Sequence, residues 1–162
     1  MNPIEQQMLN VAEDTFASLA FMFPLDDSEA ASGGEAGERA SVNFSGPVAG
    51  KLLIDAPTEM LDPLAANMLG LDDGETPSPD HKRDAFKELL NVICGNLLPV
   101  IASPRDVFNV HEPQVLDAGQ PADAAAGLAL AGSVNLALET GVVRLALLID
   151  VLSAVMLEEV PG

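Results

Sequence analysis

The chain has 162 residues, 48% of them apolar and 20% charged, which is the composition of a globular domain with enough length for a hydrophobic core. Asp and Glu outnumber Lys and Arg by 25 to 7, and the formal net charge of -18 argues against a nucleic acid or an anionic membrane as partner, since both bind clustered cations. The single Cys excludes an intrachain disulfide. Residues 1–162 are therefore predicted to form one domain.

The first half of the chain predicts two helices on either side of a hairpin. Apolar residues recur at spacings of three and four from Met8 to Met22, as they do on the buried face of a helix, and Pro24 stops the pattern. Two runs of alternating or apolar residues, broken by Gly46-Pro47, are typical of hairpin strands. In chain order we expect a helix over 4–23, an acidic loop over 25–40, strands over 41–44 and 50–55, and a helix over 57–70.

The second half begins with the longest helix signal, because Ser78-Pro79 supplies an N-cap and a proline in the first turn. Pro99 and Pro104 are expected to bend or end this helix. Near-continuous apolar residues in the last two strands are typical of central strands in a covered sheet. In order, we expect an acidic loop over 72–79, this helix, short strands over 107–110 and 114–116, a loop of small residues over 119–126, strands over 128–138 and 142–149, and a C-terminal helix over 151–160.

The two hairpins resemble each other. Ser41-Val42-Asn43 precedes a strand that ends Leu-Leu-Ile-Asp at residue 55, and Ser133-Val134-Asn135 precedes a strand with the same ending at residue 150. Each hairpin also follows a long helix. The chain is therefore predicted to hold two copies of a helix-and-hairpin unit side by side, with chance similarity of two apolar hairpins as the alternative.

No segment predicts export or insertion into a membrane. The residues after Met1 lack a basic stretch followed by an apolar one, so no signal peptide is expected. The longest charge-free stretches, 89–104 and 124–138, are shorter than the roughly 20 residues of a membrane span and contain Gly and Asn. We expect a soluble, cytoplasmic protein.

The longest helix carries a polar stripe opposite its apolar face. The apolar face is Phe86, Leu89, Leu90, Ile93 and Leu97. On a wheel of about 100° per residue, the opposite band of about 60° holds Asp84, Glu88, Asn91 and Gly95. Glu88 and Asn91 stand side by side at a spacing of three, and the general expectation for such a pair is a solvated face. Asn is a poor helix-interior residue and Gly costs about 1 kcal/mol relative to Ala, so this face is predicted to be kept small for a partner that approaches closely.

Other residues that carry chemistry are isolated. His81 and His111 lack the spacing of a metal site, so no metal ligands are expected. Cys94 is expected to be a partly buried, inert thiol. The sequence contains no glycine-rich loop of the kind that holds a phosphate.

The polar stripe resembles the signature of the CheC/CheX/FliY chemotaxis phosphatases. That signature has an acidic residue or Ser, three spacers, Glu, two spacers and Asn, followed by Pro a little over twenty residues later. Asp84, Glu88 and Asn91 match it, and 21 residues separate Asn91 from Pro113. Gly95, the Gly-x-x-x-Gly of residues 46–50 and the order of helices and hairpins extend the resemblance over most of the chain.

The resemblance implies an α/β fold in which two long helices pack on a six-stranded, mainly antiparallel sheet built from a pseudo-duplicated half. In the first helix, Phe16 takes the position of the Asn and Ala20 that of the Gly, so one motif per chain is expected. Members with a single motif are similar to CheX, which implies a homodimer.

The activity that the resemblance implies is hydrolysis of the aspartyl-phosphate of a CheY-like response regulator, in chemotaxis or a related two-component pathway. Asn91 would orient the attacking water, and Glu88 would pair with a lysine of the regulator. No cofactor of the chain's own is implied, since Mg²⁺ is expected on the regulator. The residues expected to contact the regulator are Asp84, Lys87 and Gly95, with Pro113 supporting the motif.

Two other readings of the resemblance stay open. The chain could be a non-catalytic docking module for a response regulator or a flagellar switch component, or a purely structural dimer. Three of the seven Lys and Arg residues lie near the start of the motif helix, namely Lys82, Arg83 and Lys87. These cations either offset repulsion from an acidic regulator or only aid solubility.

Overall fold

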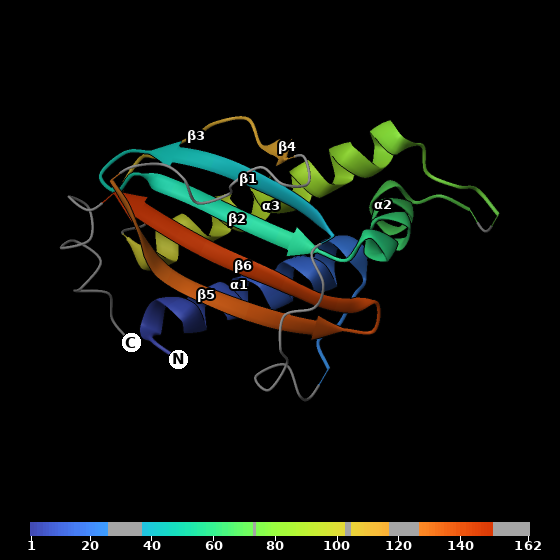
Figure 1. The fold of residues 1–162 in the computed structure, drawn as a ribbon, viewed down its shortest axis with the longest axis horizontal. Coiled ribbons are helices and arrows are strands. Elements are labelled where there is room, and N and C mark those ends of the chain that lie inside the picture. Colours follow the sequence, from blue (N-terminus) through green and yellow to red (C-terminus); the bar gives the residue numbers. More distant parts are fainter. Residues whose placement is uncertain (26–36, 73, 103–104, 117–126, 151–162) are drawn as a thin grey trace.

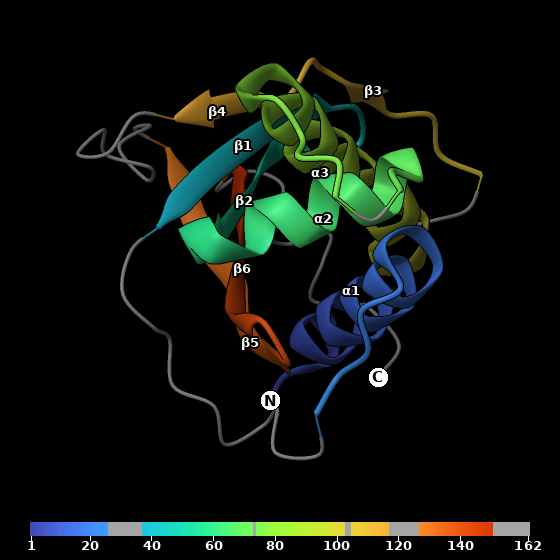
Figure 2. The ribbon, with the colours of Figure 1, turned by 90° about the vertical axis from the view of Figure 1, so that its right-hand side faces the viewer.

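The computed structural model describes residues 1–25, 37–72, 74–102, 105–116 and 127–150. Two long helices lie against one face of a six-stranded antiparallel sheet, and a shorter helix lies at one end of the pair (Figure 1, Figure 2), which confirms the expected fold class. The helices are α1 (Pro3–Ala20), α2 (Leu61–Leu69), which follows a 3₁₀ turn at Thr58–Met60, and α3 (Pro79–Ile101). The strands are β1 (Glu38–Ser45), β2 (Gly50–Ala56), β3 (Asn109–Val110), β4 (Gln114–Leu116), β5 (Leu128–Leu138) and β6 (Gly141–Asp150). Of the described helices, none is both long and apolar enough to cross a membrane.

Two antiparallel hairpins, β1–β2 and β5–β6, are joined at the centre of the sheet by pairing of β2 with β6. Each hairpin follows a long helix, and α1 packs against α3. Ser41 lies opposite Leu53, whereas Ser133 lies opposite Ala146, two residues before Leu148, which is the counterpart of Leu53. Because this shift is even, both serines keep the same face of the sheet. The predicted pair of helix-and-hairpin units is confirmed in the arrangement of these elements.

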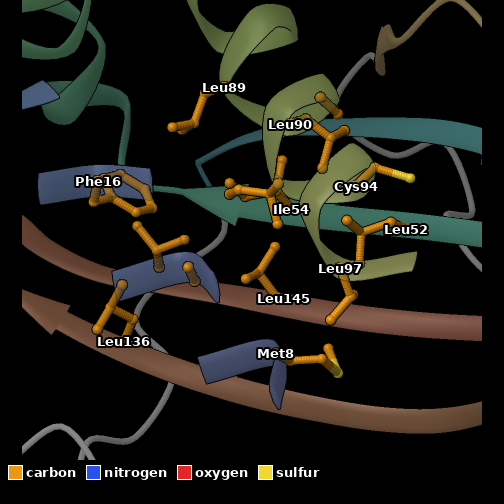
Figure 3. Close-up of a cluster of buried hydrophobic side chains, with 14 of the residues drawn as sticks. Met8, Phe16, Leu52, Ile54, Leu89, Leu90, Cys94, Leu97, Leu136 and Leu145 are labelled. Atoms are coloured by element: carbon orange, nitrogen blue, oxygen red, sulfur yellow. The ribbon is translucent and has the colours of Figure 1, made fainter. Parts of the chain in front are cut away.

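The hydrophobic core lies between the two long helices and the sheet. Figure 3 shows side chains of α1, such as Phe16, and of α3, such as Leu89, gathered over residues of β2, β5 and β6. Burial of one such side chain contributes about 1.5–3 kcal/mol, so aliphatic residues suffice for a core without Trp or Tyr. The largest fully buried side chains include Met8, Phe16, Leu52, Ile54, Met60, Leu64, Phe86, Leu89, Leu90 and Ile93.

The start of α1 is fixed to strand β5 by Glu5. The Asn2 side chain accepts a hydrogen bond from the Glu5 N–H at 2.7 Å, and the Glu5 carboxylate accepts bonds from the N–H groups of Asn2 and Ser133, each at 3.0 Å. These two backbone bonds, Asn2 first, lower the pKa of Glu5 below its usual 4.5. Because the folded-state pKa is the lower one, this contribution to stability is complete above the unfolded value and is lost as the pH falls through the folded value.

Strand β5 lies at the edge of the described sheet, although its apolar sequence predicted a central strand. The large apolar residues of β5 are buried at one end of the strand and exposed at the other. Val134, Leu136 and Leu138 are buried under the helices, whereas Leu130 is 60% exposed. Strand β6 is central, as expected.

Several element ends differ from the sequence prediction. The helix predicted over 57–70 is α-helical from Leu61, after the 3₁₀ turn, and the strand predicted over 107–110 begins at Asn109. Helix α1 ends at Ala20 and not at Phe23, because Phe21 adopts a left-handed conformation with φ 54°. Strand β1 begins at Glu38, inside the predicted loop, because Arg39 lies directly opposite Asp55 on β2 and forms an ion pair with it. Most of that loop, the small-residue loop over 119–126 and the C-terminal helix over 151–160 lie outside the described residues.

Candidate functional site

Helix α3 carries the candidate site, and local sequence fixes its start. The Ser78 hydroxyl accepts a hydrogen bond from the His81 backbone N–H at 3.1 Å, and the Ser78 N–H donates to the His81 ring at 3.5 Å. Pro79 occupies the first helical position, where a missing N–H costs nothing. The helix continues through Pro99 to Ile101, so Pro99 does not end it. His81 thus has a structural role as a cap.

The inner and outer faces of α3 divide as the sequence predicts. All five residues of the predicted apolar face are at most 1% exposed. On the opposite face Asp84, Glu88 and Gly95 are exposed, and Asn91 is half-buried. Within the described part of the chain, the side chains of Asp84, Glu88 and Asn91 form no hydrogen bond or ion pair. Helix α3 therefore presents a carboxylate and a carboxamide, one turn apart, with their hydrogen-bonding capacity unused.

Gly95 has no side chain on this face, although the space around it would accept one. A Cβ added to Gly95 would meet no atom within 4 Å, and the residue has ordinary helical geometry. Pro99, four residues later, has no N–H to donate to the Gly95 carbonyl, so the helical hydrogen bond at that carbonyl is missing. The described residues therefore give no packing reason for glycine at position 95.

Two substitutions of Gly95 test its effect on stability and its effect on partner binding separately. Gly95→Ala is expected to raise the free energy of unfolding by about 0.5–1 kcal/mol, because Ala has the higher helix propensity and fits without a clash. Thermal unfolding would show an increase of about 2 °C in Tm. Gly95→Leu is expected to keep the fold but to weaken binding of a partner that rests on this face. A fall in Tm for Gly95→Ala would contradict the open space around residue 95.

The edge strands tie the predicted Pro to the motif helix. Lys87 Nζ lies 3.3 Å from Glu112 Oε1, and Glu112 immediately precedes the buried Pro113. Strands β3 and β4 both pair with β1, and Pro113 between them has no N–H for the ladder, so it interrupts what would otherwise be one edge strand. The ion pair places Glu112, the residue before Pro113, beside α3. Glu112 was not predicted from the sequence, because no local pattern links residues 25 positions apart.

Two of the three cationic side chains near the start of α3 form ion pairs with other residues of the chain. Lys87 pairs with Glu112, and Lys82 Nζ lies 3.2 Å from Asp62 Oδ1 on α2. Arg83 is exposed and forms no ion pair with any described residue. Exposed ion pairs of this kind contribute about 0–1 kcal/mol to stability. A charged group of a binding partner can therefore replace either pair at little cost.

The corresponding stretch of α1 is not a second polar face. Phe16 and Ala20, predicted at the positions of the Asn and the Gly, are both 0% exposed and belong to the core. Phe16 lies on the apolar face that the spacing from Met8 to Met22 predicts, so its match to the Asn position holds in spacing but not in orientation. Phe16 is a core residue and not the remnant of a site.

Cys94 faces inward from the same helix. Its side chain is buried, and burial raises the pKa of the thiol to about 12. The thiol is therefore protonated at neutral pH and is a poor nucleophile, as predicted. Within the described ranges, no three His, Cys, Asp or Glu side chains gather as a metal site would require.

On the outer face of α3, Glu88 is exposed and Asn91 is half-buried, and neither side chain has a hydrogen-bond partner among the described residues. The family model described as "Chemotaxis phosphatase CheX" matches residues 39–129, more than half of the chain. The chain therefore belongs to this family. The resemblance found in the motif and the expected fold are both confirmed.

Solved structures share the fold at low sequence identity. The chemotaxis protein CheX from Desulfovibrio desulfuricans is 14% identical, with a TM-score of 0.71, and the match covers 92% of this chain and 100% of that one. CheX in a CheX–CheY–BeF3–Mg²⁺ complex from Borrelia burgdorferi is 17% identical, with a TM-score of 0.66, and the match covers 90% of this chain and 96% of that one. FliY from Thermotoga maritima is 13% identical, with a TM-score of 0.57 and coverage of 98% and 96%. No curated protein matches the sequence.

Proposed function

We propose that the chain hydrolyses the aspartyl-phosphate of a CheY-like response regulator and that Asn91 and Glu88 carry this activity. The observation that supports the proposal most directly is the stripe on α3, where both side chains face outward without an internal partner in the described part of the chain. Membership in the chemotaxis phosphatase family and the CheX–CheY complex of a relative also support it.

The proposed reaction needs little from this chain except position. A water oxygen attacks the phosphorus in line, the bond from phosphorus to the aspartyl oxygen breaks, and the regulator regains a free carboxylate while inorganic phosphate leaves with the water's protons. The Asn91 carboxamide would accept one hydrogen bond from this water and donate another, holding it at attack distance. Positioning and electrostatics supply most of the catalysis in phosphoryl transfer. The regulator would supply Mg²⁺.

Glu88 is assigned the docking role. Its carboxylate stands one turn before Asn91 and would pair with a lysine beside the regulator's phosphoryl group, setting the register in which the amide enters. Asp84, Lys87 and Gly95 would lie in the same contact, and the Lys87–Glu112 pair together with Pro113 would hold the edge of the surface.

Glu88→Ala is expected to weaken docking by about tenfold, or about 1.4 kcal/mol, with a smaller dependence of Kd on salt than the wild type shows. Titration against a regulator activated with beryllium fluoride measures this change. Glu59→Ala, which removes an exposed carboxylate from the 3₁₀ turn before α2, is the matched control and should bind as the wild type does. Unchanged affinity for Glu88→Ala would remove the proposed ion pair.

The proposal is tested with a panel of phosphorylated receiver domains and catalytic amounts of the chain. Release of many phosphates per chain identifies an enzyme, whereas binding without turnover identifies the docking module that was the alternative. Sedimentation of the purified chain tests the homodimer, which stays a prediction.

A further inference from the structure

A second surface lies where α1 ends, at the end of the molecule that faces the viewer in Figure 2. Phe21 and Phe23 are 66% and 63% exposed, whereas Phe16 is fully buried. Residues 21–23 line a pocket of about 270 Å³ together with residues of α2 and of the turn between β5 and β6. We call this feature the aromatic pocket. Both its exposure and its aromatic content are unusual in a chain whose aromatic share is only 4%.

The backbone under the aromatic pocket is held from three sides. The Asn67 side chain donates to the Ala20 carbonyl at 2.7 Å, the Met22 N–H donates to the Phe16 carbonyl at 3.1 Å, and the Leu25 N–H donates to the Ala137 carbonyl at 2.9 Å. Met22 itself is 8% exposed and anchors the segment between the two aromatic residues. A ligand that binds here therefore meets a preorganised surface and loses little affinity to ordering it.

Phe21 occupies a conformation that suits glycine. Its φ is 54°, and α2 in the same chain ends in the same conformation at Gly70, with φ 67°. A side chain as bulky as Phe is disfavoured in this conformation. Because the Phe21 side chain is largely exposed, its burial also contributes little to the free energy of folding. Neither helix termination nor the described core therefore accounts for a Phe at position 21.

Charge selects the class of partner. Glu139 is the one charged side chain among the lining residues, and the whole chain carries a formal charge of -18. A negative field of this kind attracts cationic segments. We propose that the aromatic pocket docks a peptide segment of a protein partner in which one large apolar side chain is flanked by Lys or Arg.

This surface is separate from the proposed phosphatase site. The lining residues come from the end of α1, from α2 and from the β5–β6 turn, and the polar stripe belongs to α3. The inference does not rest on the proposed reaction, and its test uses no phosphorylated regulator.

The experiment selects twelve-residue peptides from a random displayed library on the full-length wild-type chain and measures the Kd of the enriched peptides for defined variants. The peptides are expected to share a Phe, Leu or Met flanked by Lys or Arg, and their affinity is expected to fall by about tenfold or more for Phe23→Ser and for Glu139→Lys. Val107→Ser removes an apolar side chain that is 81% exposed outside the pocket and should leave the affinity unchanged. Asn91→Ala should also bind these peptides as the wild type does.

Stability separates docking from a structural role. Phe21→Gly is expected to raise Tm while it lowers peptide affinity, since the substitution removes both the strain and an aromatic wall. Selection of acidic or purely polar peptides, or equal binding by Phe23→Ser, would overturn the proposal. So would a clear fall in Tm for Phe23→Ser, which would show that the chain itself covers the pocket. Self-association of the wild type that disappears in Phe23→Ser would assign the surface to a second copy instead.

Discussion

Asn91→Ala is expected to lower the rate of regulator dephosphorylation by about a hundredfold or more while the chain stays folded. The size of the loss follows from other enzymes in which one positioning amide or oxyanion donor was removed. Stability should be unchanged or slightly higher, because the Asn91 side chain makes no hydrogen bond to a described residue and Ala has the higher helix propensity. The measurement is phosphate release under multiple turnover, which should show a lower kcat at a nearly constant KM.

Asn96→Ala is the matched control for this variant. Asn96 is exposed on the same helix, five residues later, and lies about 140° around the helix from Asn91. It should dephosphorylate the regulator as the wild type does. Asn91→Gln keeps the carboxamide but moves it outward by one methylene, so it tests position and not chemistry, and its rate should also fall. If Asn91→Ala released phosphate at the wild-type rate, the assigned role of Asn91 would be wrong, whatever the fold.

Helix α3 and its polar stripe could be predicted because every signal they need is local. Ser78 and Pro79 mark the start, and periodicity separates the buried from the exposed face. The hairpins were predictable for the same reason, since β2 follows β1 and β6 follows β5 after short connections.

Pairings across long sequence distances could not be predicted. The edge position of β5 depends on which strand lies beside β6, and its apolar run satisfies an edge strand buried on one face as well as a central one. The contact of Lys87 with Glu112 joins two residues that lie 25 positions apart.

The glycine at the start of β2 shows how closely the two halves of the sheet approach. A Cβ on Gly50 would lie 2.1 Å from the Leu148 carbonyl oxygen and 2.9 Å from the Ile149 Cα. Both are backbone atoms of β6, which cannot rotate away as a side chain can. The close contact lies where β2 and β6 join the two hairpins, so it cannot open without disturbing the centre of the sheet.

Gly50→Ala is therefore expected to lower the free energy of unfolding by about 3 kcal/mol, at the upper end of the range for overpacking, and to lower Tm by about 10 °C. Thermal and denaturant unfolding measure the loss, and Gly95→Ala provides the contrast. The same substitution should destabilise the chain at residue 50, where backbone blocks the methyl group, and stabilise it at residue 95, where nothing lies within 4 Å. Because Gly50 has no left-handed φ, backbone strain cannot produce the loss. If Gly50→Ala were as stable as the wild type, β2 and β6 would have to pair less closely than described, and the second glycine of the Gly-x-x-x-Gly segment would need another explanation.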